Sequence, residues 1–164
     1  MAKPPPPPFD REASRRFARN ALFHPPADPR IERPKIRGDR VVDFVLPLDL
    51  APTTNFTGQS GFASQKWRIH KLKKDVLLYM LAQHPRRSTP LPGRPQVIAV
   101  RFSSAAIDDS ANGAKIAIDR LTVKNGGLGY ITDDRFHVCN QRSWWEPAPK
   151  LKGFQYVAVY TGEP

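Results

Sequence analysis

The stretch VIAVRFSSAAIDDSANGAKIAIDRLT, residues 97–122, decides the fold of this chain. Its first part, 97–102, is nearly continuous in apolar and β-branched residues, which predicts a buried strand. After a polar turn at 103–110, small and apolar residues repeat at helical spacing: Ala114, Ala117, Ile118 and Leu121. This spacing predicts a helix over about 111–122 whose apolar face points toward the core.

Similar patterns on both sides predict three more strands and one more helix. The expected strands are 41–46, 135–142 and 154–160, and the expected helix runs from Ser64, a favourable N-cap, to about Gln83. The order is strand, helix, strand, helix, strand, strand. It predicts a single domain over 41–164 of the α/β or α+β class, with a small mixed β-sheet and two main helices.

Composition narrows the classes of protein that fit. The chain has 164 residues, of which 40% are hydrophobic, enough to bury a real core. Its one cysteine, Cys139, excludes an intrachain disulfide and a zinc site built from several cysteines. No apolar run approaches the roughly 18 residues of a membrane span, and the N-terminus lacks an apolar stretch of signal-peptide length. We therefore expect a cytoplasmic protein that does not contact a membrane.

Charge points to the kind of partner. The chain has 26 Lys and Arg residues and 15 Asp and Glu residues, which gives a net charge of +11. This excess favours a polyanion, most often nucleic acid, and the plainer explanation is a soluble basic surface.

Residues 1–40 differ from the rest of the chain. They hold nine of the 18 prolines, with ten basic and five acidic residues and hence a net charge of +5. Proline restricts the backbone, so this segment is expected to be a largely extended N-terminal extension, with a brief amphipathic helix over Arg11 to Phe23. Such an arm either contacts DNA or a partner subunit or is a disordered linker, and Pro-rich tails are more commonly linkers.

Acidic residues cluster in one part of this basic protein. Of the ten acids in 41–164, five lie between 108 and 134: Asp108, Asp109, Asp119, Asp133 and Asp134. One explanation is structural, with Asp108 or Asp109 as a helix cap and 133–134 as a turn. The other brings the helix start and the Gly-rich loop together, so that carboxylates from both bind Mg²⁺ through oxygen.

One lysine stands beside these acids. Asn112, Lys115 and Asp119 share one helix face, opposite the apolar residues. Lys115 either pairs with Asp119 or approaches a phosphate and stabilises the charge that builds up during its displacement. Carboxylates for a divalent ion and a lysine for the phosphate are what phosphodiester hydrolysis requires.

These residues resemble the RusA-type Holliday-junction resolvases. That family carries Asp-x-Asp-Asn, then Lys and Asp on one helix, and a later Gly-rich turn that ends in Asp-Asp. Asp109, Asn112, Lys115 and Asp119 keep this spacing, and 127–134, GLGYITDD, is similar to the later segment. Upstream, 46–47 and 52–55 resemble the family's Pro- and Asn-containing opening. The resemblance covers about 41–160.

The resemblance implies a metal-dependent endonuclease that cuts four-way DNA junctions as a homodimer. It implies Asp109 and Asp134 as metal ligands and Lys115 as the phosphate-facing residue, with Mg²⁺ or Mn²⁺ as the metal. Asp108 and Asp133 are further candidate ligands. The family's basic residues before the motif are missing here, so DNA contacts are expected from cations elsewhere. They are Lys66, Arg68, Lys71, Lys73, Lys74, Arg86 and Arg87.

One departure from the family bears on catalysis. The second Asp of the family pattern falls on Ala111, which offers no oxygen to a metal. The alternative function is therefore a branched-DNA-binding protein with impaired cleavage. A third hypothesis, a module that binds RNA or single strands, rests on the basic and aromatic residues. Trp144 and Trp145 are expected to lie in the core or an interface, with base stacking as the alternative.

Overall fold

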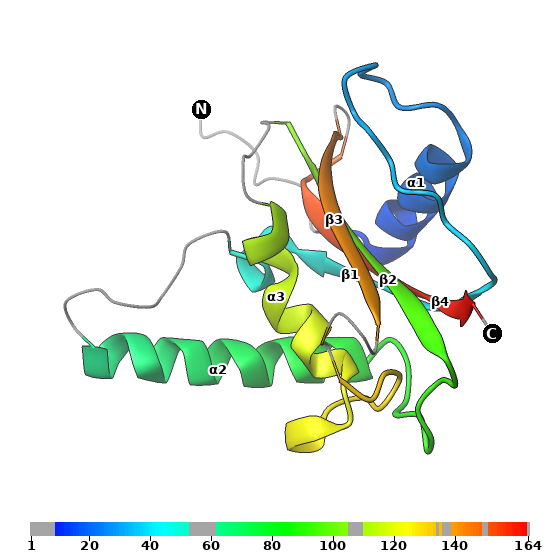
Figure 1. Cartoon of the computed structure of the whole chain (residues 1–164). Coiled ribbons are helices and arrows are strands. Elements are labelled where there is room, and N and C mark those ends of the chain that lie inside the picture. Colours follow the sequence, from blue (N-terminus) through cyan, green and yellow to red (C-terminus); the bar gives the residue numbers. More distant parts are fainter. Residues whose placement is uncertain are drawn as a thin grey trace, which may run out of the picture.

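The computed structural model describes residues 9–52, 62–104, 110–133, 135, 139–148 and 151–163. They form an α+β fold of three α-helices and a four-stranded mixed sheet (Figure 1). The elements are α1 (Arg11–Phe23), β1 (Arg40–Pro47), α2 (Phe62–Leu81), β2 (Arg94–Ser103), α3 (Ser110–Leu121), β3 (Asn140–Pro147) and β4 (Phe154–Glu163), with short 3₁₀ helices at Leu48–Leu50 and Lys124–Gly126. The predicted fold class is confirmed.

The sheet has the strand order β1-β4-β2-β3. β4 runs antiparallel to both β1 and β2, whereas β3 runs parallel to β2. Parallel neighbours need a crossover connection, and α3 lies in that connection. β3 extends to Pro147, beyond the predicted end at 142, because its last residues are the aromatic and polar WWEP rather than an apolar run; of the predicted start, 136–138 lie outside the described residues.

Two helices cover one face of the sheet. α2 and α3 pack on an apolar cluster that includes Phe44, Leu46, Val97, Ala99 and Val157, all fully buried. α3 buries the four residues that the helical spacing predicted: Ala114, Ala117, Ile118 and Leu121. Burial of several such side chains, at about 25 cal/mol per Å² of apolar surface, holds α3 in place.

α1 covers the opposite face of the sheet (Figure 1). Asp10 caps this helix by accepting a hydrogen bond from the backbone N–H of Ala13 at 3.1 Å. Ala18 is fully buried, and the ring of Phe17 meets that of Phe102 edge to face with their centroids 5.5 Å apart. The brief helix that the sequence predicted is confirmed, and it packs on the sheet.

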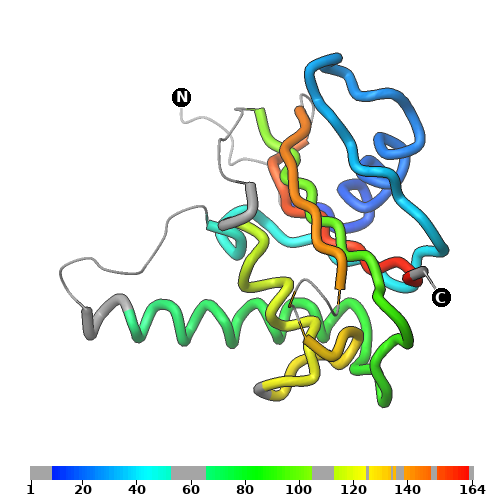
Figure 2. The backbone as a smooth tube through the Cα atoms, in the orientation of Figure 1, coloured from blue at the N-terminus to red at the C-terminus, as the bar shows by residue number. Residues whose placement is uncertain are grey.

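The described residues of the N-terminal segment therefore belong to the same packed unit as the rest. Figure 2 traces the chain from α1 through an extended stretch back into β1. The sequence predicts a largely extended, Pro-rich extension over 1–40; within 9–40, arginines of this segment have carboxylate partners on the sheet.

Asp43 on β1 is the main attachment point of α1. Its carboxylate is 1% exposed and accepts hydrogen bonds from Arg19 at 2.7 and 3.0 Å and from the Tyr156 hydroxyl at 2.8 Å. Arg15 Nε lies 3.2 Å from the same carboxylate. Burial alone would raise the pKa of Asp43, but the hydrogen bonds and nearby arginines outweigh it and keep that pKa below its ordinary value.

Another arginine of the segment binds at the opposite edge of the sheet, on β3. Arg33 donates to both carboxylate oxygens of Glu146 on β3, at 2.9 and 2.6 Å, and Glu146 is 3% exposed. The indole N–H of Trp144 donates to the same carboxylate at 2.6 Å. Charge-assisted hydrogen bonds of this kind are stronger than neutral ones. They hold the chain between α1 and β1 against the sheet.

Gln83, after α2, makes side-chain hydrogen bonds to the backbone of β1. Its amide nitrogen donates to the carbonyl of Val45 at 2.9 Å, and its amide oxygen accepts from the N–H of Val45 at 3.1 Å. Arg15 also donates to that oxygen, at 2.7 Å. β1 is an edge strand, and this side chain pairs with it where a neighbouring strand would.

Candidate functional site

The structure places Lys115 as the sequence predicted. Lys115 is exposed on α3, on the opposite side from Ala114 and Ala117, which are buried. Asp119, one turn further on, is half-buried. Among the described residues no carboxylate forms an ion pair with Lys115. The pairing of Lys115 with Asp119, which was the structural alternative, is not found.

Asp108, Asp109 and Asp134 lie outside the described residues, and so does the side chain of Asn112. Within the described parts of the chain, no three His, Cys, Asp or Glu side chains gather closely enough to hold a metal ion.

Asp133 is the one predicted ligand that the structure describes. It is 8% exposed, and its Oδ2 lies 2.9 Å from Lys124 Nζ and 2.9 Å from Arg135 Nε. Two cations therefore contact this carboxylate. Its geometry supports the structural explanation, a turn held by ion pairs.

The Gly-rich loop and the predicted DNA-binding arginines lie side by side. Arg86 donates to the carbonyl of Gly126 at 3.0 Å, and the N–H of Arg87 donates to the carbonyl of Leu128 at 2.8 Å. Gly129 has a φ of +79°, and a Cβ there would lie 2.7 Å from the carbonyl oxygen of Arg87. Glycine is therefore required for this close approach. Arg86 and Arg87 are both exposed next to the loop that leads to Asp133.

The predicted basic face of α2 is largely exposed. Lys66, Arg68, Lys71 and Lys74 are exposed, and Lys73 is half-buried. Lys71 Nζ lies 3.9 Å from Asp75 Oδ2, an exposed pair of little energetic weight. Sequence reasoning missed Trp67, which is 65% exposed and shares a helix side with Lys71 and Lys74. An aromatic side chain among lysines is suited to stack on a base.

A buried arginine lies below the first turns of α3. Arg101 on β2 is 8% exposed and donates through Nη1 to the carbonyl of Ala51 at 2.6 Å. A Cβ on Gly113 would lie 2.9 Å from that nitrogen, so glycine lets α3 approach the guanidinium. Within the described residues, Arg101 Nε and the Oε1 of fully buried Gln155 have no hydrogen-bond partner. Burial lowers the pKa of Arg101.

Both tryptophans of β3 are half-buried, with their indole nitrogens bound. Trp144 packs against the cluster under α1. The indole N–H of Trp145 donates to the hydroxyl of Ser103 at 2.9 Å. Their placement in and beside the core agrees with the predicted default rather than with base stacking.

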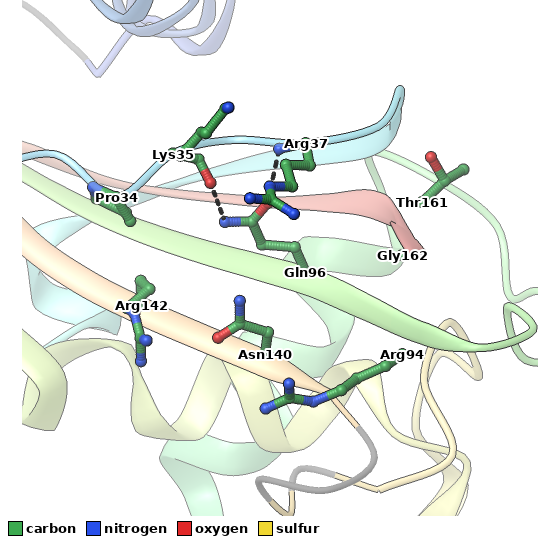
Figure 3. Close-up of a pocket in the computed structure, with 9 residues that line it drawn as sticks. All are labelled: Pro34, Lys35, Arg37, Arg94, Gln96, Asn140, Arg142, Thr161 and Gly162. Atoms are coloured by element: carbon green, nitrogen blue, oxygen red, sulfur yellow. Dashed lines mark hydrogen bonds between the residues drawn. The ribbon is translucent and has the colours of Figure 1, made fainter. Parts of the chain in front are cut away.

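A cationic pocket that the sequence did not indicate lies on the α1 face of the sheet. It has a volume of about 630 Å³ and lies where β2 and β3 begin and β4 ends, below residues 34–37 (Figure 3). Lys35, Arg37, Arg94 and Arg142 are among its lining residues. A faint signal was present: Arg94 and Gln96 on β2, and Asn140 and Arg142 on β3, are alternate residues, which lie on one face of a sheet.

No protein-family model matches the chain, and no curated protein or solved structure proved significantly similar to it. Across the described residues, no helix is long and apolar enough to cross a membrane.

Proposed function

We propose that this protein is a metal-dependent endodeoxyribonuclease that resolves four-way DNA junctions by phosphodiester hydrolysis, and that it acts inside the cell as a homodimer. The resemblance to RusA-type resolvases is the source of this proposal. The element order over 41–163 and the exposed basic face of α2 support it.

The observation that carries the proposal is the position of Lys115. It lies in the second turn of α3, shortly after Asp108 and Asp109 in sequence, and it is exposed with no carboxylate partner among the described residues. An ammonium group in that position is available to a phosphate. It would stabilise the negative charge that builds up on the phosphoryl oxygens during displacement.

Mg²⁺, which the resemblance implies, supplies charge neutralisation and a more acidic water when it is bound. Asp109 and Asp134 would hold it, with Asp108 as a further candidate. Asp133 is left out of this set because Lys124 and Arg135 already occupy its carboxylate.

Cleavage of a synthetic four-way junction in Mg²⁺ or Mn²⁺ tests the proposal. We expect the wild-type protein to nick the junction and Asp134→Asn to abolish nicking. Lys115→Gln should lower the single-turnover rate about 10²–10³-fold, the usual effect of removing one stabilising donor, with junction affinity nearly unchanged. Arg16→Gln removes an exposed cation of α1 and is the matched control. Wild-type nicking that survives Asp134→Asn contradicts the assignment of the site.

A second candidate is a branched-DNA-binding protein that does not cut. The ion pairs of Asp133 and the alanine at 111 favour it, because both reduce the number of carboxylates left for a metal. Junction binding that is independent of divalent ions, with no nicks in Mg²⁺ or Mn²⁺, would establish this function and reject the first.

A further inference from the structure

The exposed tryptophan of α2 lies away from the core of the domain. Trp67 is 65% exposed, whereas Trp144 and Trp145 are half-buried. Tryptophan is a side chain that folded proteins bury to a large extent. At about 3.6 residues per turn, Trp67 and the fully buried Val76 are about two and a half turns apart, so they lie on opposite sides of the helix. The indole of Trp67 therefore faces away from the core that α2 covers.

The half of α2 that carries Trp67 extends beyond α3 and the sheet (Figure 1). Among the described residues of this helix, the side chains that pack on the apolar cluster begin at Leu72 and include the fully buried Val76 and Met80. Residues 66–71 therefore form a helical projection that is held by the packing of the second half of α2. A projection of this kind is suited to reach a partner rather than to stabilise the domain.

Basic residues surround Trp67 on this projection. Lys66 and Arg68 flank it in sequence, Lys71 and Lys74 follow on the same side of the helix, and all four are exposed. The described part of α2, 66–81, holds five Lys and Arg residues and one acid. A second copy of the chain would bring the same cations against each other across a symmetric interface. The charge of this surface therefore favours a polyanion over self-association.

The chemistry of the indole selects the part of the nucleic acid that Trp67 contacts. The indole is uncharged and has one N–H donor, so it adds little to phosphate binding, which the lysines supply. Its flat face is suited to stack on a base. In an intact duplex, neighbouring bases cover the faces of each base, whereas a branch point interrupts this continuous stack. Trp67 is therefore suited to DNA at the place where it branches.

We propose that Trp67 stacks on a base exposed at the branch point of a DNA junction, while the lysines around it contact the neighbouring phosphates. The inference rests on the proposed function in taking branched DNA as the ligand. A straight duplex meets the same lysines but offers Trp67 no open base face. The cations of α2 thus provide affinity for any DNA, and the aromatic side chain provides the preference for junctions.

Binding to a four-way junction and to a linear duplex, both measured without divalent metal, tests the role of Trp67. Trp67→Ala should lower junction affinity about 5–150-fold, the usual effect of losing one stacked base, and should change duplex affinity less than about twofold. Trp67→Phe keeps an aromatic face and should retain most of the junction affinity. Ultraviolet cross-linking of a junction with iodouracil at its branch point should attach the DNA to the peptide that contains Trp67.

Two further variants on the same side of α2 serve as controls. Leu78→Ala also removes an exposed apolar side chain, which is 54% exposed, and should leave both affinities unchanged. Lys71→Gln with Lys74→Gln should weaken junction and duplex binding alike, and should lower the slope of log K against log salt by about 0.9 for each lost phosphate contact. Equal melting temperatures show that the variants fold, and sedimentation velocity compares their oligomeric states.

The outcomes separate this inference from the proposed function. Wild-type junction binding that Trp67→Ala leaves unchanged overturns the stacking role and leaves the nuclease proposal intact. Equal losses of junction and duplex affinity overturn it as well, because Trp67 would then not distinguish a branch point. A changed oligomeric state in Trp67→Ala identifies a contact between copies of the chain and also overturns it. If the wild-type protein binds neither junction nor duplex, the proposed function and this inference fail together.

Discussion

Buried charged side chains on the two faces of the sheet differ in their partners. On the α1 face, Asp43 and Glu146 are nearly inaccessible, and each is paired with arginines of the N-terminal segment. On the α2/α3 face, Arg101 is also buried, yet its described partner is one backbone carbonyl. The ionic partners of a buried charge offset its desolvation, whereas a buried charge without an ionic partner keeps that cost.

This difference accounts for part of the excess of basic residues in the chain. Arg15, Arg19 and Arg33 lie in the segment that composition alone assigned to a linker or a DNA-binding arm. Their carboxylate partners hold that segment to the sheet. These three arginines are therefore structural, and other cations are exposed on α2 and beside the Gly-rich loop.

Removal of Asp43 should have the largest effect on stability. Asp43→Ala leaves Arg15, Arg19 and the Tyr156 hydroxyl without their acceptor, and we expect a loss of about 3–5 kcal/mol in the free energy of unfolding. Urea denaturation measures it. Asp28→Ala is the control, because the Asp28–Arg30 pair is exposed and should change stability little. Similar values for both variants would show that α1 is not held by this carboxylate.

Removal of Arg33 should have the next largest effect. Arg33→Gln removes the cation paired with buried Glu146 and leaves the indole N–H of Trp144 as its donor among the described residues, so we expect a loss of about 1.5–3 kcal/mol in the same measurement. Limited proteolysis should cut the chain between α1 and β1 sooner in this variant than in the wild type. Equal cleavage rates would mean that other contacts fix this segment.

Acid should weaken the α1 face selectively. The pKa of Asp43 is lowered in the folded state, so its contribution to stability is complete above its unfolded pKa and disappears as pH falls through the folded value. The free energy of unfolding should therefore fall more steeply below about pH 4 in the wild type than in Asp43→Asn. Parallel curves for the two proteins would contradict the lowered pKa.

Replacement of Arg101 should have the smallest effect. Arg101→Met removes a desolvated charge and leaves the carbonyl of Ala51 without its donor, so the two changes partly offset each other. We expect a loss of about 1 kcal/mol or less, well below that of Asp43→Ala. A loss as large as that of Asp43→Ala would show that Arg101 has an ionic partner and would remove the contrast between the faces.

Local patterns allowed most of the fold to be predicted. The β-branched runs at 41–46 and 97–102 and the helical spacing around Ala114 and Leu121 depend on neighbouring residues, and each lies in the expected element. The packing of the N-terminal segment could not be predicted, because Arg33 and Glu146 are 113 residues apart. Proline content describes the local backbone and carries no information about such distant ion pairs.

The candidate site could be predicted only in part. Lys115 is exposed because its helix buries the opposite face, which the spacing already indicated. The ion pairs of Asp133 with Lys124 and Arg135 could not be predicted, because an Asp-Asp pair does not reveal which cations the fold brings to it. The basic pocket was missed because its arginines come from three separate segments.

Gln83 affects how readily the protein associates with itself at high concentration. Its primary amide offers Val45 the same donor and acceptor that a strand from another molecule would offer. Another chain can pair with β1 at this point only by displacing that side chain. Gln83 therefore protects the sheet against edge-to-edge association, and a chain with leucine there would be more prone to aggregate even where its fold is unchanged.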